Sequence, residues 1–511
     1  MKKYILILGT MAFPLLAQNV LTIDATQGKH RISKYIYGHF AEHLGGCIYG
    51  GIWVGPDSKI PNIQGYRKDV FEALKALEIP VLRWPGGCYA DIYHWKDGIG
   101  PREKRPKTKN VFWGGVIEDN SFGTHEFLNF CEMLGCDPYV AVNVGSGSIL
   151  EMIEWIQYMT SNEDIPMANL RRANGRKEPW NVRFIGIGNE SWGCGGNMTP
   201  EHYADLFKNY ATYARQYGGN RLQLVACGSY ADNLNWTQVV MENAHRLMDH
   251  ISLHYYTIAG EGWHAKSSAT GFGEGLYFNG LKKASEIDGY LAGHCAIMDK
   301  IDPEKKIGLL VDEWGIWTDV EPGTNPAFLF QQNSMRDALI ASLTFDVFNR
   351  RCDRIQMANI AQTVNVLQAV ILTQGNKMIK TPTYYAFELY KKHKQSLLLP
   401  GVLSCESYEY QGQSMPALSH TASLTEKGTL YLTVSNVNPH QSIPLKVEIT
   451  GKEIHKVLDA KILTAPQFNS VNTFDNPDIV KPMEFKGFQI EGTHTLRIDL
   501  PSKSIIALEI E

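Results

Sequence analysis

Eight short apolar runs, most of them followed by a helix-like segment, constrain the fold of this chain more than any other feature. The runs cover residues 35–40, 79–84, 139–144, 184–188, 222–226, 251–255, 307–311 and 354–360. Helices are expected between them at 69–77, 124–134, 149–159, 200–217, 237–248, 286–298 and 334–349. Alternation of strands and helices is typical of a parallel sheet, and eight such units predict closure into a barrel. We therefore expect an α/β fold with a (β/α)8 TIM barrel over residues 35–395.

The pattern changes near Leu397. From there on, alternating stretches such as 429–435, 445–450 and 496–500 are separated by turn residues, and no helix stands out. This pattern predicts an all-β sandwich domain over residues 396–511. A short β-like piece at 21–23, in the N-terminal segment 18–34, is expected to join that sandwich.

Residues 1–17 resemble a secretory signal peptide. Lys2 and Lys3 precede an apolar run at 4–16, and Ala17 is a small residue at the expected cleavage point. The run is short for a membrane span. The sequence therefore predicts export to the periplasm or the medium, without a membrane-spanning segment.

Charge and cysteine content narrow the class of protein. The formal net charge is -4, and the most conspicuous basic stretch, 101–109, is typical of a solvated loop, so no nucleic-acid partner is expected. The nine cysteines are scattered, several of them in apolar runs, which favours buried free thiols over a disulfide framework. Cys131 and Cys136 match no common zinc spacing, and the sequence predicts no metal and no cofactor.

Two of the apolar runs lead into a glutamate. FIGIGNESW, at 184–192, places Asn189 and Glu190 after the fourth strand, and LLVDEW places Glu313 at the end of the seventh. Catalytic groups of parallel barrels lie at the carboxyl ends of the strands, so both glutamates are expected at one mouth. A single glutamate is most often a solvated surface group. A pair of this kind, each flanked by tryptophan, favours a functional role.

Two carboxyl groups across a barrel mouth meet the chemical needs of glycosidic-bond hydrolysis. One protonates the leaving oxygen, and the other attacks the sugar or activates water. The acid needs a raised pKa, and the second group needs hydrogen-bond donors that keep it ionised. His254 and Tyr256, in the LHYY stretch that ends the sixth strand, are candidate donors, with a satisfied core pair as the alternative.

The stretch GHFAEHLGG offers a different chemistry, because Glu42 lies between His39 and His43. A metal-dependent hydrolase that uses these groups together with His254 would be inhibited by a chelator. The spacing lacks a matching third ligand nearby, so this alternative is not favoured.

Several motifs together resemble the retaining α-L-arabinofuranosidases of glycoside hydrolase family 51. They are YGHFAEHLGG, LRWPGG, DGIGP, GIGNESWGCGG, SLHYY, DEWGIW, MANIAQTVNV and NTFDNPDIVKP, which cover nearly the whole chain after residue 35. The motifs NE and DEW occur singly in many barrel glycosidases, but the combination is specific. The resemblance implies an exo-acting enzyme that removes terminal non-reducing α-L-arabinofuranosyl residues from arabinan, arabinoxylan or arabino-oligosaccharides by double displacement. It also implies a homo-oligomer, often a hexamer.

The resemblance implies a role for each matching residue. Glu190 resembles the acid/base of the family and Glu313 its nucleophile, Asn189 would hold the sugar 2-hydroxyl, and Tyr256 would hydrogen-bond the nucleophile. The other expected substrate-binding residues are Glu42, Cys88, His254, Gln362, Trp113 and Trp317, of which the two tryptophans resemble aromatics near the aglycone and could equally be core.

Two positions depart from the family pattern. Some relatives have asparagine where this chain has Cys88, and a thiol is a weaker donor, so a sugar contact is expected to be lost or taken over by backbone. Asparagine is also frequent where this chain has Gly315, which is expected to loosen the loop that carries Trp317. Both changes bear on sugar preference more than on the reaction.

Two rival functions remain open. Another retaining barrel glycosidase, such as a xylosidase or an endo-glucanase, would show itself in a panel of aryl glycosides. A catalytically inactive carbohydrate-binding protein would have no need of both glutamates.

Overall fold

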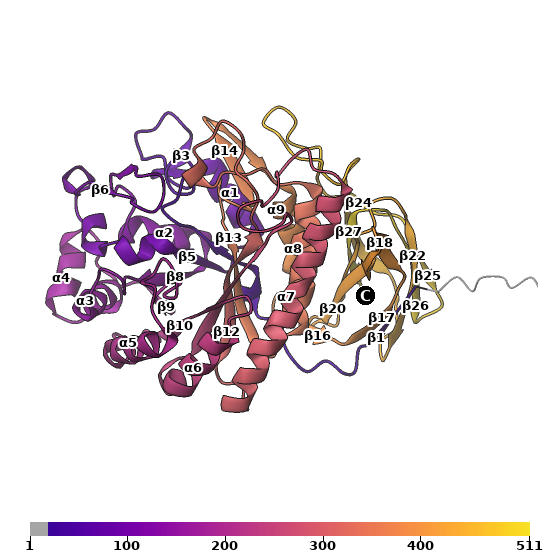
Figure 1. Ribbon diagram of the computed structural model, residues 1–511, viewed down its shortest axis with the longest axis horizontal. Helices are drawn as coiled ribbons and strands as arrows, with labels where there is room; N and C mark the ends of the chain where they lie inside the picture. Colours follow the sequence, from indigo (N-terminus) through magenta and orange to yellow (C-terminus); the bar gives the residue numbers. More distant parts are fainter. Residues whose placement is uncertain (1–18) are drawn as a thin grey trace, which may run out of the picture.

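The computed structural model describes residues 19–511, so the predicted signal segment, residues 1–17, lies outside the described residues. Eight parallel strands form a closed barrel, in which the last strand pairs with the first (Figure 1). In order around the barrel they are β2 (Gly38–Phe40), β5 (Val81–Trp84), β8 (Asp137–Val142), β9 (Phe184–Ile187), β10 (Gln223–Tyr230), β11 (His250–Thr257), β12 (Gly308–Ile316) and β13 (Ile355–Ala361). The predicted (β/α)8 barrel is confirmed.

Helices surround the barrel strands. They are α1 (Lys68–Leu77), α2 (Thr124–Leu134), α3 (Ile149–Thr160), α4 (Pro166–Ala173), α5 (Pro200–Tyr213), α6 (Leu234–Ala244), α7 (Glu274–Ile301), α8 (Met335–Arg350) and α9 (Pro382–Tyr390). Within residues 19–511, none of the helices has the length and apolar character needed to cross a membrane.

Four elements differ from the sequence prediction. Residues Lys34–Tyr37 form a 3-10 helix, so the first strand is shorter than expected. α4 and α9 were not predicted. α7 begins well before residue 286, because its first turns pack against the C-terminal domain, where the buried Tyr277 hydroxyl donates to the carbonyl of Val437 (2.7 Å). This tertiary contact outweighs the turn-like glycines at its start.

The barrel interior is layered. Toward the amino ends of the strands, an apolar cluster fills it, made of Tyr35, Val81, Tyr139, Phe184, Val225, Leu310 and Met357. Side chains repeat on the same face of a strand every second residue. Arg83 comes two residues after Val81 in β5, and Asp312 comes two residues after Leu310 in β12. Both buried side chains therefore also point into the barrel. The apolar cluster therefore fills the amino end of the barrel, and the buried charges of Arg83 and Asp312 form the next layer toward the carboxyl end.

The C-terminal domain contains two main sheets. One has the order β17-β1-β22-β26-β25, and the other has the order β16-β20-β21-β27-β23-β24. Their strands are β1 (Val20–Asp24), β16 (Leu397–Leu399), β17 (Gly401–Ser404), β20 (Leu418–Leu424), β21 (Leu430–Asn436), β22 (Ile443–Thr450), β23 (Val457–Leu463), β24 (Met483–Glu484), β25 (Phe488–Glu491), β26 (Thr495–Leu500) and β27 (Ser504–Ile510). The N-terminal strand β1 lies parallel to β22 and antiparallel to β17. In Figure 1, α7 and α8 lie between the barrel strands and these sheets.

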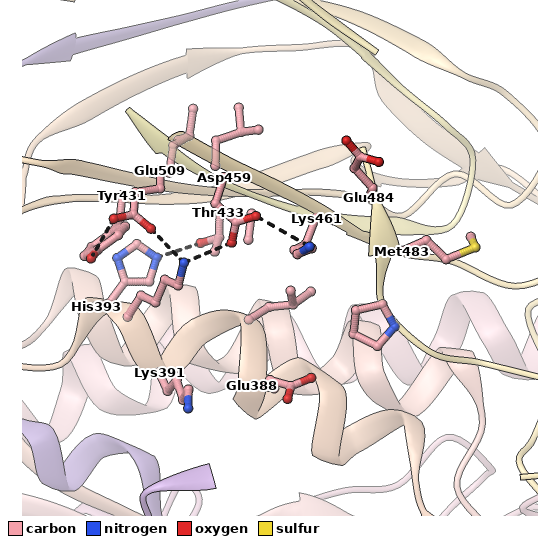
Figure 2. A pocket seen from close by; sticks show the side chains of 16 residues that line it. Glu388, Lys391, His393, Tyr431, Thr433, Asp459, Lys461, Met483, Glu484 and Glu509 are labelled. Carbon is pink, nitrogen blue, oxygen red and sulfur yellow. Dashed lines mark hydrogen bonds and ion pairs between the residues drawn. The ribbon is translucent and has the colours of Figure 1, made fainter. Parts of the chain in front are cut away.

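A hollow of about 280 Å³ lies where α9 and the 3-10 helix after it meet the second sheet (Figure 2). Three of its charged side chains pair with one another, since the Lys392 ammonium contacts Asp459 at 3.1 Å and Glu509 at 2.7 Å. The buried ring of His393 is engaged by Ser423 and Thr433. None of the residues that line this hollow is an expected site residue, so the functional site lies elsewhere.

Candidate active site

Glu190 and Glu313 both lie at the carboxyl end of the barrel. β9 ends at Ile187, and the chain then turns, with the Gly193 amide donating to the carbonyl of Glu190 (2.7 Å). Glu313 lies inside β12, which stays paired with β11 as far as Ile316, so the expectation that Glu313 ends its strand is wrong. Two strands, β10 and β11, separate β9 from β12 around the barrel.

His254, on the intervening strand β11, joins the two glutamates. Its Nδ1 lies 2.9 Å from Glu190 Oε1 and 3.5 Å from Glu313 Oε2. Oxygen atoms of the two carboxyl groups lie within 4.8 Å of each other. Retaining glycosidases hold their carboxyl groups about 5 to 5.5 Å apart, and inverting ones hold them about 6.5 to 9.5 Å apart. The spacing therefore fits direct attack by one carboxylate.

Strong donors surround the Glu313 carboxylate. Arg83 Nη1 donates to Oε1 at 2.8 Å, and the Tyr256 hydroxyl donates to Oε2 at 2.7 Å. Arg83 Nη2 also donates to the Asn189 side-chain oxygen at 2.6 Å, which leaves the Asn189 amide group to donate elsewhere. Charge-assisted hydrogen bonds of this kind hold the carboxylate in a fixed position, so this environment suits a nucleophile.

Asp312 and Arg83 belong to the site but were not among the predicted site residues. The Asp312 carboxylate accepts from the Tyr139 hydroxyl (2.8 Å) and lies 3.2 Å from His254 Nε2. Burial raises the pKa of Asp312, but Arg83 and His254 outweigh burial and hold that pKa below its usual value. The signal in the sequence is a charged residue inside each of two apolar strands, VLRW and LLVDEW.

Glu190 and His254, which contact each other, both have shifted pKa values. Burial raises the pKa of Glu190 and the Glu313 charge adds to this, while His254 partly opposes it. Burial lowers the pKa of His254, but Glu313, Asp312 and Glu190 raise it to about 10. Glu190 is therefore suited to carry a proton as an acid beside an imidazolium ion. Its side chain keeps 18% of its surface exposed, so a substrate can reach it.

Glu42, Trp113 and Gln362 come together beside this pair. The Glu42 carboxylate accepts from Trp113 Nε1, Gln362 Nε2 and the Tyr89 amide, each at 3.0 Å. Burial, and then the charge of Glu313, raise the pKa of Glu42 to about 7. Because Glu42 follows β2 and Gln362 follows β13, the pair lies at the seam where the barrel closes.

Cys88 is part of a disulfide bond with Cys194, with a Cα–Cα distance of 5.6 Å, so the prediction of a free thiol is wrong for these two cysteines. The bond joins the loop after β5 to the loop that follows Glu190, 106 residues further along the chain. Closure of the barrel brings the two loops together, which local sequence does not reveal. Among the described residues the other cysteines are free, namely Cys47, Cys131, Cys136, Cys227, Cys295, Cys352 and Cys405.

The histidines of GHFAEHLGG do not converge with Glu42. The buried His39 ring packs against Phe387 at 4.8 Å, and burial lowers its pKa to about 3. His43 stacks on Tyr89, also at 4.8 Å between ring centroids. A metal site built from these two histidines and Glu42 therefore has no support in their contacts.

Trp317 lies close to Glu313, because its ring meets that of Tyr256 edge to face at 5.0 Å and the Tyr256 hydroxyl donates to Glu313. Gly315 does not loosen this region. It lies within β12, paired with Tyr256, at a φ of +146°, which side chains rarely adopt. The expectation of a loosened loop is therefore wrong, and glycine satisfies a backbone need of the strand.

His254→Asn is expected to move the alkaline limb of the kcat/KM profile to higher pH. With Glu190 as the acid, that limb would report the loss of its proton, and His254 lowers the pKa of Glu190 through its hydrogen bond and positive charge. Without His254, Glu190 holds its proton to higher pH. The measurement is kcat/KM on an aryl glycoside substrate between pH 4 and 10 at about half-unit steps.

His250→Asn is the matched control. His250 is the first residue of the same strand, it is also buried, and its pKa is lowered to about 4, so it is neutral over most of this range. The control should leave the limb where it is in the wild type. An alkaline limb that stays in place, or moves to lower pH, in His254→Asn would contradict the link between His254 and Glu190.

A closed parallel barrel with two adjacent carboxyl groups at its mouth, one suited to act as an acid and one held by donors, defines a glycoside hydrolase of the retaining class. Two family descriptions match the chain: "Alpha-L-arabinofuranosidase 1 domain" over residues 73–268 and "Alpha-L-arabinofuranosidase C-terminal domain" over residues 312–504. The chain belongs to the α-L-arabinofuranosidases of glycoside hydrolase family 51.

Individual relatives resemble the chain over nearly its whole length. An intracellular exo-α-L-arabinofuranosidase of Bacteroides ovatus is 53% identical over 96% of this chain and 95% of the relative. The crystal structure of the GH51 arabinofuranosidase from Xanthomonas axonopodis pv. citri has a TM-score of 0.95 and 45% identity, covering 97% of this chain and 100% of that one. An arabinose complex of the Thermotoga maritima α-L-arabinofuranosidase has a TM-score of 0.83 and 30% identity over the same shares.

The prediction of export is contradicted by the Bacteroides ovatus relative, because that protein is named an intracellular enzyme. The prediction rested on charge and hydrophobicity at residues 1–17 alone. An apolar run of that length after two lysines meets the composition of a signal, but composition does not establish that a segment is used as one.

Proposed function

We propose that this chain removes terminal α-L-arabinofuranosyl residues from the non-reducing ends of arabinan, arabinoxylan or their oligosaccharides by double displacement. The observation that carries the proposal is the approach of the Glu190 and Glu313 carboxyl oxygens to within 4.8 Å. Within the proposal, residues 35–395 carry the reaction, while 18–34 and 396–511 form the second unit. Assembly into a homo-oligomer, up to a hexamer, belongs to the same proposal, and light scattering measures it.

In the first step, Glu313 attacks the anomeric carbon while Glu190 gives its proton to the leaving oxygen. The glycosidic bond breaks, a bond forms between the sugar and Glu313, and the leaving saccharide departs as an alcohol. Arg83 and Tyr256 hold the carboxylate in place until it attacks. Asn189, fixed through its oxygen by Arg83, offers its amide group to the sugar 2-hydroxyl, a contact that strengthens in the transition state.

In the second step, Glu190, now ionised, takes a proton from water, and the water oxygen displaces Glu313 from the sugar. Two inversions give net retention, and both carboxyl groups return to their starting states. The imidazolium of His254 lies against Glu190 throughout, so it stabilises the ionised form that accepts this proton. Glu42 and Gln362 would hold the other furanose hydroxyls, and Trp113 and Trp317 would lie near the aglycone.

The stereochemistry of the first product tests the proposal. Hydrolysis of 4-nitrophenyl α-L-arabinofuranoside followed by NMR should show α-arabinofuranose before mutarotation. Initial release of the β-anomer would overturn double displacement. A panel of aryl xylosides and glucosides separates this proposal from the xylosidase and endo-glucanase alternatives, because those enzymes would prefer the panel substrates.

A further inference from the structure

A row of five aromatic side chains leads away from the nucleophile and returns to the loop of the acid. Starting at Tyr256, whose hydroxyl donates to Glu313, the ring centroids follow one another at 5.0 Å to Trp317 and 5.2 Å to Trp263. The row continues at 5.9 Å to Tyr230 and 6.0 Å to Trp192. Trp192 is the second residue after Glu190, so the row joins both sides of the site.

Trp263 stands at the outer edge of this row on a short hairpin. The Gly260 amide donates to the Lys266 carbonyl and the Glu261 amide to the Ala265 carbonyl, both at 2.9 Å. The Asp319 amide donates to the Ser267 carbonyl at 2.8 Å, which ties the hairpin to the segment after Trp317. With 42% of its surface exposed, Trp263 is one of the few large apolar side chains that the described residues leave open to solvent.

The row lies on the side where the leaving saccharide departs. Glu190 protonates the leaving oxygen, so the sugar attached to that oxygen must lie beside Glu190. Tyr230 is the register partner of His254, which contacts Glu190, and Trp192 is fixed by its Nε1 donating to the Gly228 carbonyl (3.1 Å). A sugar leaving past Glu190 therefore meets Tyr230 and Trp192 first and Trp263 further out.

We propose that Trp263, with Tyr230, forms a binding site for a sugar unit of the leaving chain beyond the unit directly bonded to the arabinofuranosyl residue. The proposal rests on the proposed function. Aromatic rings offer flat apolar faces with polar edges, and pyranose and furanose rings present C–H faces that pack on them. The ring of Trp263 meets that of Trp317 at a near-right angle and keeps 42% of its surface exposed, so part of the ring is available to a saccharide.

This site would make the enzyme sensitive to the length of the leaving chain. The wild-type kcat/KM should rise from the α-1,5-linked arabinobiose to the arabinotetraose, because only the longer chains reach Trp263. In Trp263→Ala the ratio of kcat/KM for tetraose over biose should fall about 3- to 10-fold, the range expected for loss of one aromatic contact. Most of the change should lie in KM, and Trp263→Phe should restore part of the ratio.

Tyr213→Ala is the matched control, because Tyr213 is also an exposed aromatic but ends α5 on the outside of the barrel. Its ratio should equal that of the wild type. An equal loss on biose and tetraose in Trp263→Ala would overturn the proposal, because the ring would then act only through Trp317. A wild-type ratio near one would also overturn it. Failure of the wild type to hydrolyse α-L-arabinofuranosyl fluoride, which has no leaving saccharide, would instead refute the proposed function on which it rests.

Discussion

Glu313→Ala is expected to lower kcat/KM on 4-nitrophenyl α-L-arabinofuranoside by on the order of 10⁴- to 10⁶-fold, the scale on which loss of a covalent nucleophile acts. The variant removes the group that forms the sugar ester and leaves a space beside Arg83 and Tyr256. Sodium azide should enter that space and displace the leaving group directly. A single displacement inverts the anomeric centre, so the product should be the β-azide, which NMR identifies.

Two further variants serve as controls for this result. Glu313→Gln keeps an oxygen acceptor for Arg83 and should lose activity to a similar extent, which separates lost chemistry from lost packing. Glu126→Gln is the matched control, because Glu126 is a buried carboxylate that accepts from Arg102 (2.9 Å) and Arg105 (3.1 Å) at the start of α2, away from Glu190 and Glu313. It should keep its activity. Near-normal turnover by a folded Glu313→Ala protein would reject Glu313 as nucleophile.

Glu190→Ala is expected to lower kcat/KM by about 10²- to 10⁴-fold on substrates with poor leaving groups, and much less on 2,4-dinitrophenyl arabinofuranoside. A good leaving group departs without a proton, so the first step continues. The arabinosyl-enzyme should then accumulate, because no base activates water. A burst of dinitrophenolate followed by a slow steady rate would report this.

Azide is expected to give products of opposite anomeric configuration with the Glu313→Ala and Glu190→Ala variants. In Glu190→Ala, azide attacks the arabinosyl-enzyme, so the second displacement restores the original configuration and the product should be the α-azide. The β-azide from this variant, or a loss of activity that is equal for all leaving groups, would contradict the acid/base role. Glu126→Gln serves again as the control for a buried carboxylate outside the site.

The local pattern of apolar residues is sufficient to predict the barrel strands but not every helix. Each barrel strand is a short apolar run, and burial on both faces makes such runs visible in the sequence. The first half of α7 could not be predicted, since glycines near its start favour a turn and only contact with the C-terminal domain makes it helical. The first strand is also shorter than predicted, because residues 35–37 are apolar enough to resemble a strand but belong to the 3-10 helix Lys34–Tyr37.

For the site, the sequence predicted Glu190 and Glu313 but not the buried charges of Arg83 and Asp312 beside them. Arg83 and Asp312 meet inside the barrel although β13 and β2 separate their strands, β5 and β12, so their contact depends on how the barrel closes rather than on neighbours in the chain. The Cys88–Cys194 bond was missed for the same reason. Trp263 was also missed, since a tryptophan in a loop carries no periodic signal, and only the ring-to-ring contacts reveal its place.

The strand β1 has a consequence for how the protein is made. Because β1 precedes the barrel in the sequence, the ribosome completes it first. Its neighbours in the sheet, β17 and β22, are completed only after the entire barrel has been synthesised. Until residues 443–450 have been synthesised, β1 has no parallel neighbour, and a chain that stops before them leaves one edge of β1 unpaired. The second domain can therefore close only on a finished chain, and prematurely terminated products are expected to aggregate.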